Sequence, residues 1–556
     1  MHHYTHAHTI YSLACHCYGF SSRVNRLNNY ARGGETMRKV RMLLVLSVIW
    51  GVVLFMFLPA TVDRKSAQEM FEQARQNALQ ANIAFKKCRQ FLDDVKKLKD
   101  DDSNFYFFSG DIWLVCDAGA DVYPFVVVTA YFLEPSFLPA LRQTLHDEIR
   151  LTSDSKGIPQ DFDLKKNQVV PRERSQVIFG ASEYCKDGLA AVVEVTGKDE
   201  WFLRMKQIMD ALHDEIGHGD HYGLGGEVAG NLLQVIVRLY GMTKDKKYLR
   251  WGERIADDFL LKRDFKPTVL SDHGCEIISG LTMLYGLEAE VNPNKAREYQ
   301  PKIQSMLDYI LQNGVDTDGL MYLFCGQPPE NPMRTDNWGY NYIAFLLYDM
   351  VNSSQRYRTA VEKVLLNLPK YKGFPWGCKS TSDFVYLDQL ADSVEGGIYL
   401  YNRLPLPTAR EWIEAEMQTL LSMNFPVHKF GANAVRTTMQ YAFMQTQGLY
   451  LREWREDVQI GAVRDGKTLY IYLETERDWA GKLCFDVPRH RELLGFSLDY
   501  PRINSFPEWF TVKSGQEFII DGLPRGRRRV TGSVLRKGLS VNLQARQPLR
   551  LTVRLR

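Results

Sequence analysis

Acidic and aromatic side chains gather at or just before the start of several apolar segments in this 556-residue chain. Each of these segments is long enough for a buried helix, and loops rich in Gly, Asp, Asn and Pro separate them. The polar residues concerned are Asp117, Asp121, Glu183, Glu227, His273, Glu276, Asp336, Tyr340, Asp392, Glu395 and Arg436. Paired carboxyl groups perform general acid and base chemistry, so we interpret the pattern as a candidate catalytic site.

Glycoside hydrolysis is the reaction that this mixture of residues fits best. It usually needs one protonated and one ionised carboxyl group beside the scissile bond. The predicted catalytic carboxyls are Asp336, Glu395, Glu227 and Asp392. Asp336 is favoured because it lies beside Trp338 and Tyr340 in a Gly- and Asn-rich approach to a helix.

Carboxylates, amides and aromatic rings occur together in the same loops, and a sugar site needs this combination. Flat rings cover the apolar faces of a pyranose, while carboxylates and amides bind its hydroxyl groups. The residues that we expect to bind substrate are Asp117, Asp121, His273, Glu276, Trp338, Tyr340 and Arg436. Any one acid at a helix start also fits an ordinary cap, and the repetition with Trp, Tyr and His favours a site.

Two histidine-rich stretches contain metal-ligand residues, but neither predicts a metal site. His213, His218 and His221 offer enough donors, but their spacing matches no established zinc pattern. The His- and Cys-rich residues 1–36 precede a more typical export start at Met37, so we interpret them as a misplaced start or a disordered leader. We therefore expect no metal ion from these clusters.

Pairs of helices must bring the acidic residues together. Residues 196–204 (TGKDEWFLR) align with residues 242–250 (MTKDKKYLR) at an offset of 46 residues, which is typical of stacked helical hairpins. An open solenoid and a closed ring both fit this period. We predict an (α/α)6-type toroid over residues 105–452, because parallel inner helices in a ring point their starts at one mouth.

The two ends of the chain have different patterns. Leu549, Leu551 and Val553 alternate with polar residues, which indicates a half-buried strand, and we assign residues 453–556 to a small β-sandwich. The predicted fold class is therefore mainly α, with β structure at the carboxyl end. Residues 66–104 are helix-favouring, and we predict a helical stalk, with a helix lying against the next domain as the alternative.

One segment near the amino terminus, Met42–Ala60, has nineteen residues without a charge, enough to cross a bilayer as a helix. Basic residues precede it, which favours a cytoplasmic amino end. We predict a signal anchor over residues 37–65 that holds the protein in the inner membrane with its bulk exported into the cell envelope. A cleaved signal peptide, which would release the protein, is the alternative.

Composition excludes other classes of protein. Hydrophobic residues make up 45% of the chain and charged residues 24%, which is ordinary for globular proteins. The 69 basic and 66 acidic residues give a net charge of +3, too small for a protein that wraps nucleic acid. The nine cysteines show no CxxC pairing, so buried thiols are expected rather than a disulfide framework.

Together these features resemble the six-hairpin glycosidase superfamily, and are nearest to its β-L-arabinofuranosidase-like and unsaturated glucuronyl hydrolase-like groups. The segments that look like its hairpins are YGLGGEVAGNLLQVIVRLYGMTKDKKYL, DHGCEIISGLTMLYGLEAE and TDNWGYNYIAF. The resemblance implies an (α/α)-barrel enzyme that acts on a poly- or oligosaccharide without a cofactor. The cysteine-rich zinc arrangement of the arabinofuranosidase-like enzymes is not visible, so their cysteine mechanism is not expected.

Two alternatives stay open. A polysaccharide lyase acting on uronic-acid polymers needs a base and a group that neutralises the substrate carboxylate, and Tyr340, His273 and Arg436 could supply these. A non-catalytic glycan-binding or scaffold protein would keep a cavity without the chemistry. Their products distinguish them, because a lyase forms an unsaturated product and a hydrolase forms a new reducing end.

Overall fold

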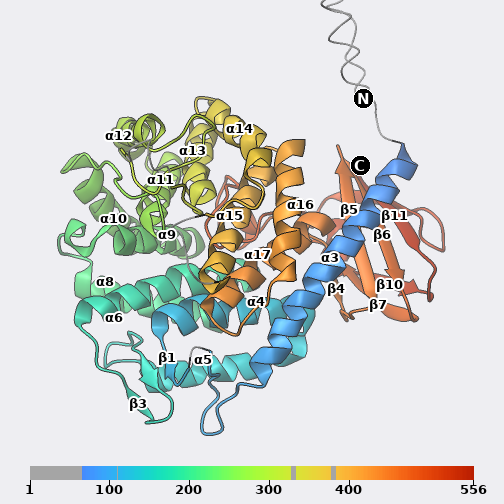
Figure 1. Ribbon diagram of the computed structural model, residues 1–556, viewed down its shortest axis with the longest axis horizontal. Helices are drawn as coiled ribbons and strands as arrows, with labels where there is room; N and C mark the ends of the chain where they lie inside the picture. The colour runs from blue at the N-terminus through green and yellow to red at the C-terminus, as the bar shows by residue number, and fades with distance from the viewer. Residues whose placement is uncertain (1–65, 109, 327–332, 377–382) are drawn as a thin grey trace, which may run out of the picture. The chain divides into compact units, whose positions relative to one another are not determined.

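The fold is seen in a computed structural model of the chain (Figure 1). The described residues are 66–108, 110–326, 333–376 and 383–556. The predicted leader over residues 1–36 and the predicted membrane segment Met42–Ala60 lie outside these ranges. Within the described ranges, one helical stretch, Val115–Leu133, is long and apolar enough to span a bilayer, and most of it is buried inside the protein.

Seven helical stretches within the described residues form a ring. They are η1 (Val115–Val122) with α4 (Tyr123–Leu133), α6 (Arg174–Glu183) with η3 (Tyr184–Leu189) and α7 (Ala190–Thr196), α9 (Gly226–Thr243), α11 (Gly274–Val291), α13 (Trp338–Asn352), α15 (Asp383–Arg403) and α17 (Lys429–Thr446). Each stretch contacts the next, and α17 contacts η1 and α4, so the ring is closed. The predicted toroid of helical hairpins is therefore present, and its ring has seven inner stretches within the described residues.

A second layer of helices lies outside the ring. These are α5 (Leu138–Thr152), α8 (Glu200–Ile216), α10 (Lys246–Ala256) with η5 (Asp257–Leu261), α12 (Pro293–Asn313), α14 (Arg358–Asn367) with η6 (Leu368–Tyr371), and α16 (Pro407–Ser422). In both copies of the sequence repeat, an aspartate caps the outer helix: Asp199 accepts from the backbone N of Trp201 at 3.1 Å and Asp245 from that of Lys247 at 2.9 Å. The repeat therefore marks the turn from an inner to an outer helix.

Glycines set the spacing between inner helices near the site. A Cβ on Gly339 of α13 would lie 2.4 Å from the Cα of Gly396 on α15, so only glycine permits this approach. The contact brings the next residue on α13, Tyr340, within 2.7 Å of Glu395 Oε2. Gly230 allows the same closeness between α9 and the backbone of Glu276 on α11.

Helix α3 (Ala67–Lys96) is not a free stalk. Its Asn77 Nδ2 donates to the Ala462 carbonyl at 2.8 Å, and its Lys87 Nζ donates to the Met423 carbonyl at 2.6 Å. It lies along the first strands of the carboxyl-terminal region and against α17 and α4 (Figure 1). Residues 67–556 form one compact unit, so α3 supplies the outer partner of the first inner stretch, and the stalk prediction is corrected to the alternative of a packed helix.

The carboxyl-terminal region forms two antiparallel sheets. The five-stranded sheet has the order β5 (Val458–Asp465), β6 (Thr468–Thr475), β11 (Leu549–Leu555), β8 (Glu517–Asp521), β9 (Arg528–Thr531), and the three-stranded sheet has the order β10 (Leu539–Leu543), β7 (Trp479–Cys484), β4 (Tyr450–Arg452). The predicted alternation of β11 is confirmed, since Leu551 and Val553 are buried.

Short elements complete the described fold. They are β1 (Ile112–Trp113), β2 (Phe162–Asp163), β3 (Gln168–Val169), η2 (Pro135–Phe137), η4 (Tyr222–Leu224), α18 (Arg489–Glu492) and α19 (Gly532–Arg536). The three short strands pair in the order β1, β2, β3 within the helical part of the chain. Sheet structure is therefore not confined to the carboxyl-terminal region.

A buried ionic triad ties the carboxyl-terminal segment to the ring. Glu194 of α7 accepts from Arg238 Nε of α9 at 2.7 Å and from Arg502 Nε and Nη2 at 2.9 Å. All three side chains are nearly inaccessible. Burial raises the pKa of Glu194, but the two guanidinium groups outweigh it and hold the pKa at about 2.

We expect Glu194→Gln to lower the free energy of unfolding by about 3–5 kcal/mol at pH 7, because it leaves two buried arginines without their counter-charge. The pKa of Glu194 is lower in the folded than in the unfolded chain, so its contribution is complete above pH ~4.5 and is lost as the pH falls towards ~2. Urea unfolding at several pH values measures both effects. The exposed pair Glu517 and Arg529 is the control, since Glu517→Gln should change stability by less than ~1 kcal/mol.

Glu288 of α11 is a buried carboxyl whose two oxygens have no hydrogen-bond partner among the described residues. Burial, together with Glu253, raises its pKa to about 8. The charged form is therefore disfavoured in the folded state, and stability falls as the pH rises from ~4.5 to ~8. We expect the free energy of unfolding of Glu288→Met, measured with urea, to exceed that of the parent by about 4–5 kcal/mol at pH 8.5 and to lose most of this advantage at pH 4.5. An equal advantage at both pH values would contradict this assignment.

Candidate active site

A cavity of about 200 Å³ lies where the inner helices start. Its wall includes six of the predicted residues: Asp121, His273, Glu276, Tyr340, Asp392 and Arg436. They come from η1, the N-cap and first turn of α11, the first turn of α13, and the helices α15 and α17. The ring therefore places side chains that are far apart in sequence around one small volume.

The other predicted residues lie beside or beneath this cavity. Trp338 is buried, donates from Nε1 to Ser393 Oγ at 2.8 Å and packs against Trp376 and Trp412, so it does not offer a face to a sugar. Asp117 pairs with Lys429 Nζ at 3.0 Å, and it is Lys429 that reaches the wall.

Glu395 lies beneath the cavity, and both of its carboxylate oxygens accept hydrogen bonds. Its Oε2 accepts from Arg436 Nε at 2.6 Å and Tyr340 OH at 2.7 Å, and its Oε1 accepts from Gln440 Nε2 at 2.7 Å and from the Tyr399 hydroxyl. The Glu395 side chain is fully buried. This carboxylate is therefore placed to hold Arg436 and Tyr340 rather than to reach a substrate.

Two carboxyls one turn apart on α15, Asp388 and Asp392, both line the cavity. Asp392 Oδ1 accepts from Arg436 Nη2 at 2.7 Å, and Asp388 Oδ1 accepts from Asn433 Nδ2 at 2.9 Å. Burial raises the pKa of both carboxyls; Arg436 opposes the rise at each of them, and Lys429 does so at Asp388. Burial outweighs the cations at both carboxyls, and the ion pair with Arg436 is the contact that favours the charged form of Asp392.

Asp121 is a carboxyl of the cavity with proton-donor character. It makes no hydrogen bond to another described residue, and burial raises its pKa to about 8, with Asp187 and Asp388 adding to the effect. Asp336, the favoured residue from the sequence, does not line the cavity. Burial and the nearby Asp388 raise its pKa to about 7.

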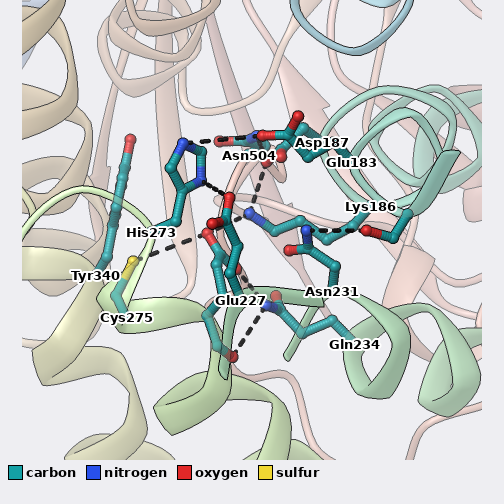
Figure 2. A network of polar contacts seen from close by, with 12 residues as sticks. Glu183, Lys186, Asp187, Glu227, Asn231, Gln234, His273, Cys275, Tyr340 and Asn504 are labelled. Atoms are coloured by element: carbon teal, nitrogen blue, oxygen red, sulfur yellow. Dashed lines mark hydrogen bonds and ion pairs between the residues drawn. The ribbon is translucent and has the colours of Figure 1, made fainter. Parts of the chain in front are cut away.

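His273 lies among carboxylates at one side of the cavity (Figure 2). Its Nδ1 is 3.1 Å from Glu227 Oε1, and its Nε2 is 3.3 Å from Asp272 and 3.8 Å from Glu183. Burial acts to lower the pKa of His273, but these carboxylates outweigh it and raise the pKa to about 10. Glu227, a predicted catalytic residue, lines a neighbouring pocket together with His273 and Asp272.

Sequence reasoning missed several residues of the wall. Lys186 of η3 bridges Asp187 at 2.6 Å and Glu276 at 2.5 Å, and a Lys-Asp pair inside an apolar helix was a signal that could have found it. Asn504 donates from Nδ2 to Asp187 Oδ1 at 2.5 Å and comes from the carboxyl-terminal region with a φ of 62°. No pattern in the sequence indicates that this loop reaches the ring. Phe430, which is partly exposed, is a second aromatic residue of the wall in addition to Tyr340.

Metal-ligand geometry occurs at two places in the described part of the chain. One group is Glu183, Asp187 and His273, and the other is His490, Asp499 and Glu508. The histidines weighed from sequence belong to neither group. His221, for example, is buried between Asp258, at 2.9 Å from its Nδ1, and Trp251, which donates to its Nε2 at 3.2 Å.

Comparisons with known proteins find neither a matching family model nor a matching curated protein. Among solved structures, a family 127 β-L-arabinofuranosidase from Geobacillus stearothermophilus T6 is similar at 12% identity over 85% of this chain and 76% of that one, with a TM-score of 0.34. A second family 127 β-arabinofuranosidase matches at 13% identity over 87% and 78% of the two chains, with a TM-score of 0.33.

A third structure, described as a glycoside hydrolase, is 11% identical over 78% of this chain and 71% of its own, with a TM-score of 0.34. Both arabinofuranosidases belong to a group that the sequence resembles. At these scores the likeness assigns no residue and no reaction to this chain. Its function follows from the side chains around the cavity.

Proposed function

We propose that this protein is a glycoside hydrolase whose reaction takes place in the cavity at the mouth of the helical ring. The observation that carries the proposal is the contrast between carboxyls in one small cavity. Asp121 has a pKa of about 8 and holds its proton at neutral pH. Burial also raises the pKa of Asp388 and Asp392, but Asp392 forms an ion pair with Arg436 at 2.7 Å that opposes the rise, whereas Asp121 pairs with no cation among the described residues. A protonated and an ionised carboxyl in one site match the needs of glycoside hydrolysis.

In this proposal Asp121 donates a proton to the leaving oxygen, and the Asp388–Asp392 pair supplies the ionised partner. Asp336 and Glu227 stay candidates for acid or base roles from the edge of the site. Arg436 and Tyr340 position Asp392, because each donates to its Oδ1, at 2.7 Å and 3.1 Å. Glu395 in turn holds these two donors.

The charge of the cavity favours a neutral or cationic sugar. Six carboxyls line it, against the four groups Lys186, His273, Lys429 and Arg436 that can carry positive charge. The charge of Arg436 is already matched by Glu395 and Asp392. A uronic-acid polymer would bring further negative charge into this cavity.

The lyase alternative is weaker for the same reason. Burial raises the pKa of Tyr340 well above its ordinary value, and Asp392 and Glu395 add to the rise, so this phenol is a poor base. Arg436 is held by two carboxylates and is not free to neutralise a third. The non-catalytic alternative predicts glycan retention without turnover.

The decisive experiment incubates the purified protein with a panel of plant, algal and host oligosaccharides. Released reducing ends and ultraviolet absorbance of unsaturated products are measured together. We expect reducing ends without the chromophore on neutral glycans. Unsaturated products from a uronate polymer would replace the hydrolase proposal with the lyase, and retention without any product would replace it with a binding protein.

We also propose that the Met42–Ala60 segment anchors the protein in the inner membrane with the described part exported. The support is the uncharged length of the segment and the basic residues before it. Fractionation of cells that express the whole chain should recover the protein with the membranes. Once the outer layers of the cell envelope are permeabilised, externally added protease should digest the described part. Recovery in the cytoplasm would overturn this proposal.

A further inference from the structure

Three ligand-type side chains meet beside the cavity. Glu183 ends α6 and Asp187 lies one turn later in η3, so both project from the same side of one continuous helical stretch. His273, the N-cap residue of α11, meets them from the neighbouring hairpin (Figure 2). One ligand atom of each residue lies within 4.8 Å of those of the other two.

Glu183 lacks the partners that a buried carboxylate ordinarily has. Its side chain is 8% exposed, and it makes no hydrogen bond to another described residue. Its nearest charged partner is His273 Nε2 at 3.8 Å, which is too long for a hydrogen bond. A buried carboxylate without hydrogen bonds is costly, and a bound cation would offset that cost.

The imidazole of His273 has carboxylates beside both ring nitrogens. Glu227 Oε1 lies 3.1 Å from Nδ1, and Asp272 Oδ1 lies 3.3 Å from Nε2. A carboxylate beside the nitrogen that does not bind the ion is common in histidine metal sites, and an ion at Nε2 would displace the ring proton there. Nε2 is also the nitrogen that lies 3.8 Å from Glu183. Two ligands at ~2.1 Å from one tetrahedral ion lie roughly 3.4 Å apart. The distance between His273 Nε2 and the Glu183 oxygen therefore needs to shorten only slightly for both to bind one ion.

Only one of the two carboxylate oxygens of Asp187 accepts hydrogen bonds from described residues. Lys186 Nζ and Asn504 Nδ2 both donate to Oδ1, at 2.6 Å and 2.5 Å, while Oδ2 has no hydrogen-bond partner among the described residues. Lys186 is also held by Glu276 at 2.5 Å. Among the described residues, the other cation in contact with the cluster is Lys186, and two carboxylates already match its charge.

We propose that Glu183, Asp187 and His273 bind one divalent transition-metal ion through two carboxylate oxygens and one imidazole nitrogen. This donor set suits Zn²⁺ or Mn²⁺ and contains no thiolate. Asp187 and His273 also line the cavity, so the ion borders the space where a substrate binds and has open positions towards it. Binding of the ion does not depend on the proposed hydrolase activity.

Calorimetric titration of the chelator-treated full-length protein with ZnCl₂, and separately with MnCl₂, tests the site. We expect one equivalent to bind with at least one of the two metals, and the unfolding temperature to rise with that metal. Glu183→Gln and His273→Gln should each weaken this binding at least 10-fold and remove the rise. His490→Gln, in the second cluster of ligand-type residues, is the matched control and should bind as the parent does.

Each outcome decides the proposal. Absence of stoichiometric binding with both metals, unchanged binding in Glu183→Gln and His273→Gln, or loss of binding in His490→Gln would overturn it. If Glu183→Gln does not fold, His273→Gln decides, because that side chain is 38% exposed. No glycan enters the measurement, so failure of the hydrolase proposal would leave this result unaffected.

Discussion

Replacement of Asp121 by asparagine is expected to lower kcat for glycan hydrolysis by about 10²–10⁴-fold. The amide keeps the shape of the side chain but has no acidic proton to donate to the leaving group. Because Asp121 makes no hydrogen bond to another described residue, the change should leave the fold intact. Kinetics on the best substrate of the glycan panel, with the unfolding temperature as a check on folding, measures the effect.

The pH profile makes this expectation specific to a proton donor. Burial raises the pKa of Asp121 to about 8, so the parent enzyme should lose activity as the pH rises through about 8 and the donor ionises. The residual activity of Asp121→Asn should lack this alkaline limb. Asp111→Asn, at an exposed ion pair with Lys165, is the control and should keep both the rate and the profile. Parent-like kcat in Asp121→Asn would remove Asp121 from the mechanism.

The second large effect is expected at the buried pair of Arg436 and Glu395. Arg436→Met should lower the free energy of unfolding by about 3–5 kcal/mol, because it leaves Glu395 buried without its counter-charge. Asp392 and Tyr340 also lose a guanidinium neighbour, at 2.7 Å and 3.3 Å, so turnover should fall as well. Chemical unfolding and kinetics on the same preparation separate the two consequences.

A double variant distinguishes the stabilising role from the functional one. Adding Glu395→Met to Arg436→Met removes both buried charges, so part of the lost stability should return, while Tyr340, Tyr399 and Gln440 still lack their acceptor. Activity should not return, because Asp392 still lacks its guanidinium partner. Arg529→Met, at an exposed pair with Glu517, is the stability control and should change the free energy of unfolding by less than ~1 kcal/mol. Recovery of full turnover in the double variant would show that Arg436 does not position the site.

Much of the helical architecture could be predicted from local patterns. The apolar segments are each long enough for a helix, and the repeated Asp before an outer helix is a local capping signal. The alternation of Leu551 and Val553 likewise depends only on the two-residue period of a strand. The helix α3 was harder, because its incomplete apolar stripe does not reveal that the strands covering it lie hundreds of residues later in the chain.

The candidate site was predicted only in part for a related reason. Acids and aromatics at helix starts indicated where the site lies, since parallel helices in a ring share one mouth. Which of them face the cavity depends on the rotation of each helix about its axis. Trp338 turns into the core to meet Ser393, whereas Tyr340, two residues later, reaches the wall. Such rotations are set by contacts between helices, which no single segment encodes.

The sequence by itself therefore determined the kinds of element, their order, and the gathering of carboxyls at the starts of inner helices, because each of these depends on neighbours along the chain. Only the tertiary structure decided that Glu395 is a buried partner of Arg436, that Asp121 faces the cavity, and that Asn504 reaches Asp187. These outcomes depend on burial and on contacts between distant residues. Burial and such contacts also set the pKa values that separate a proton donor from a structural ion pair.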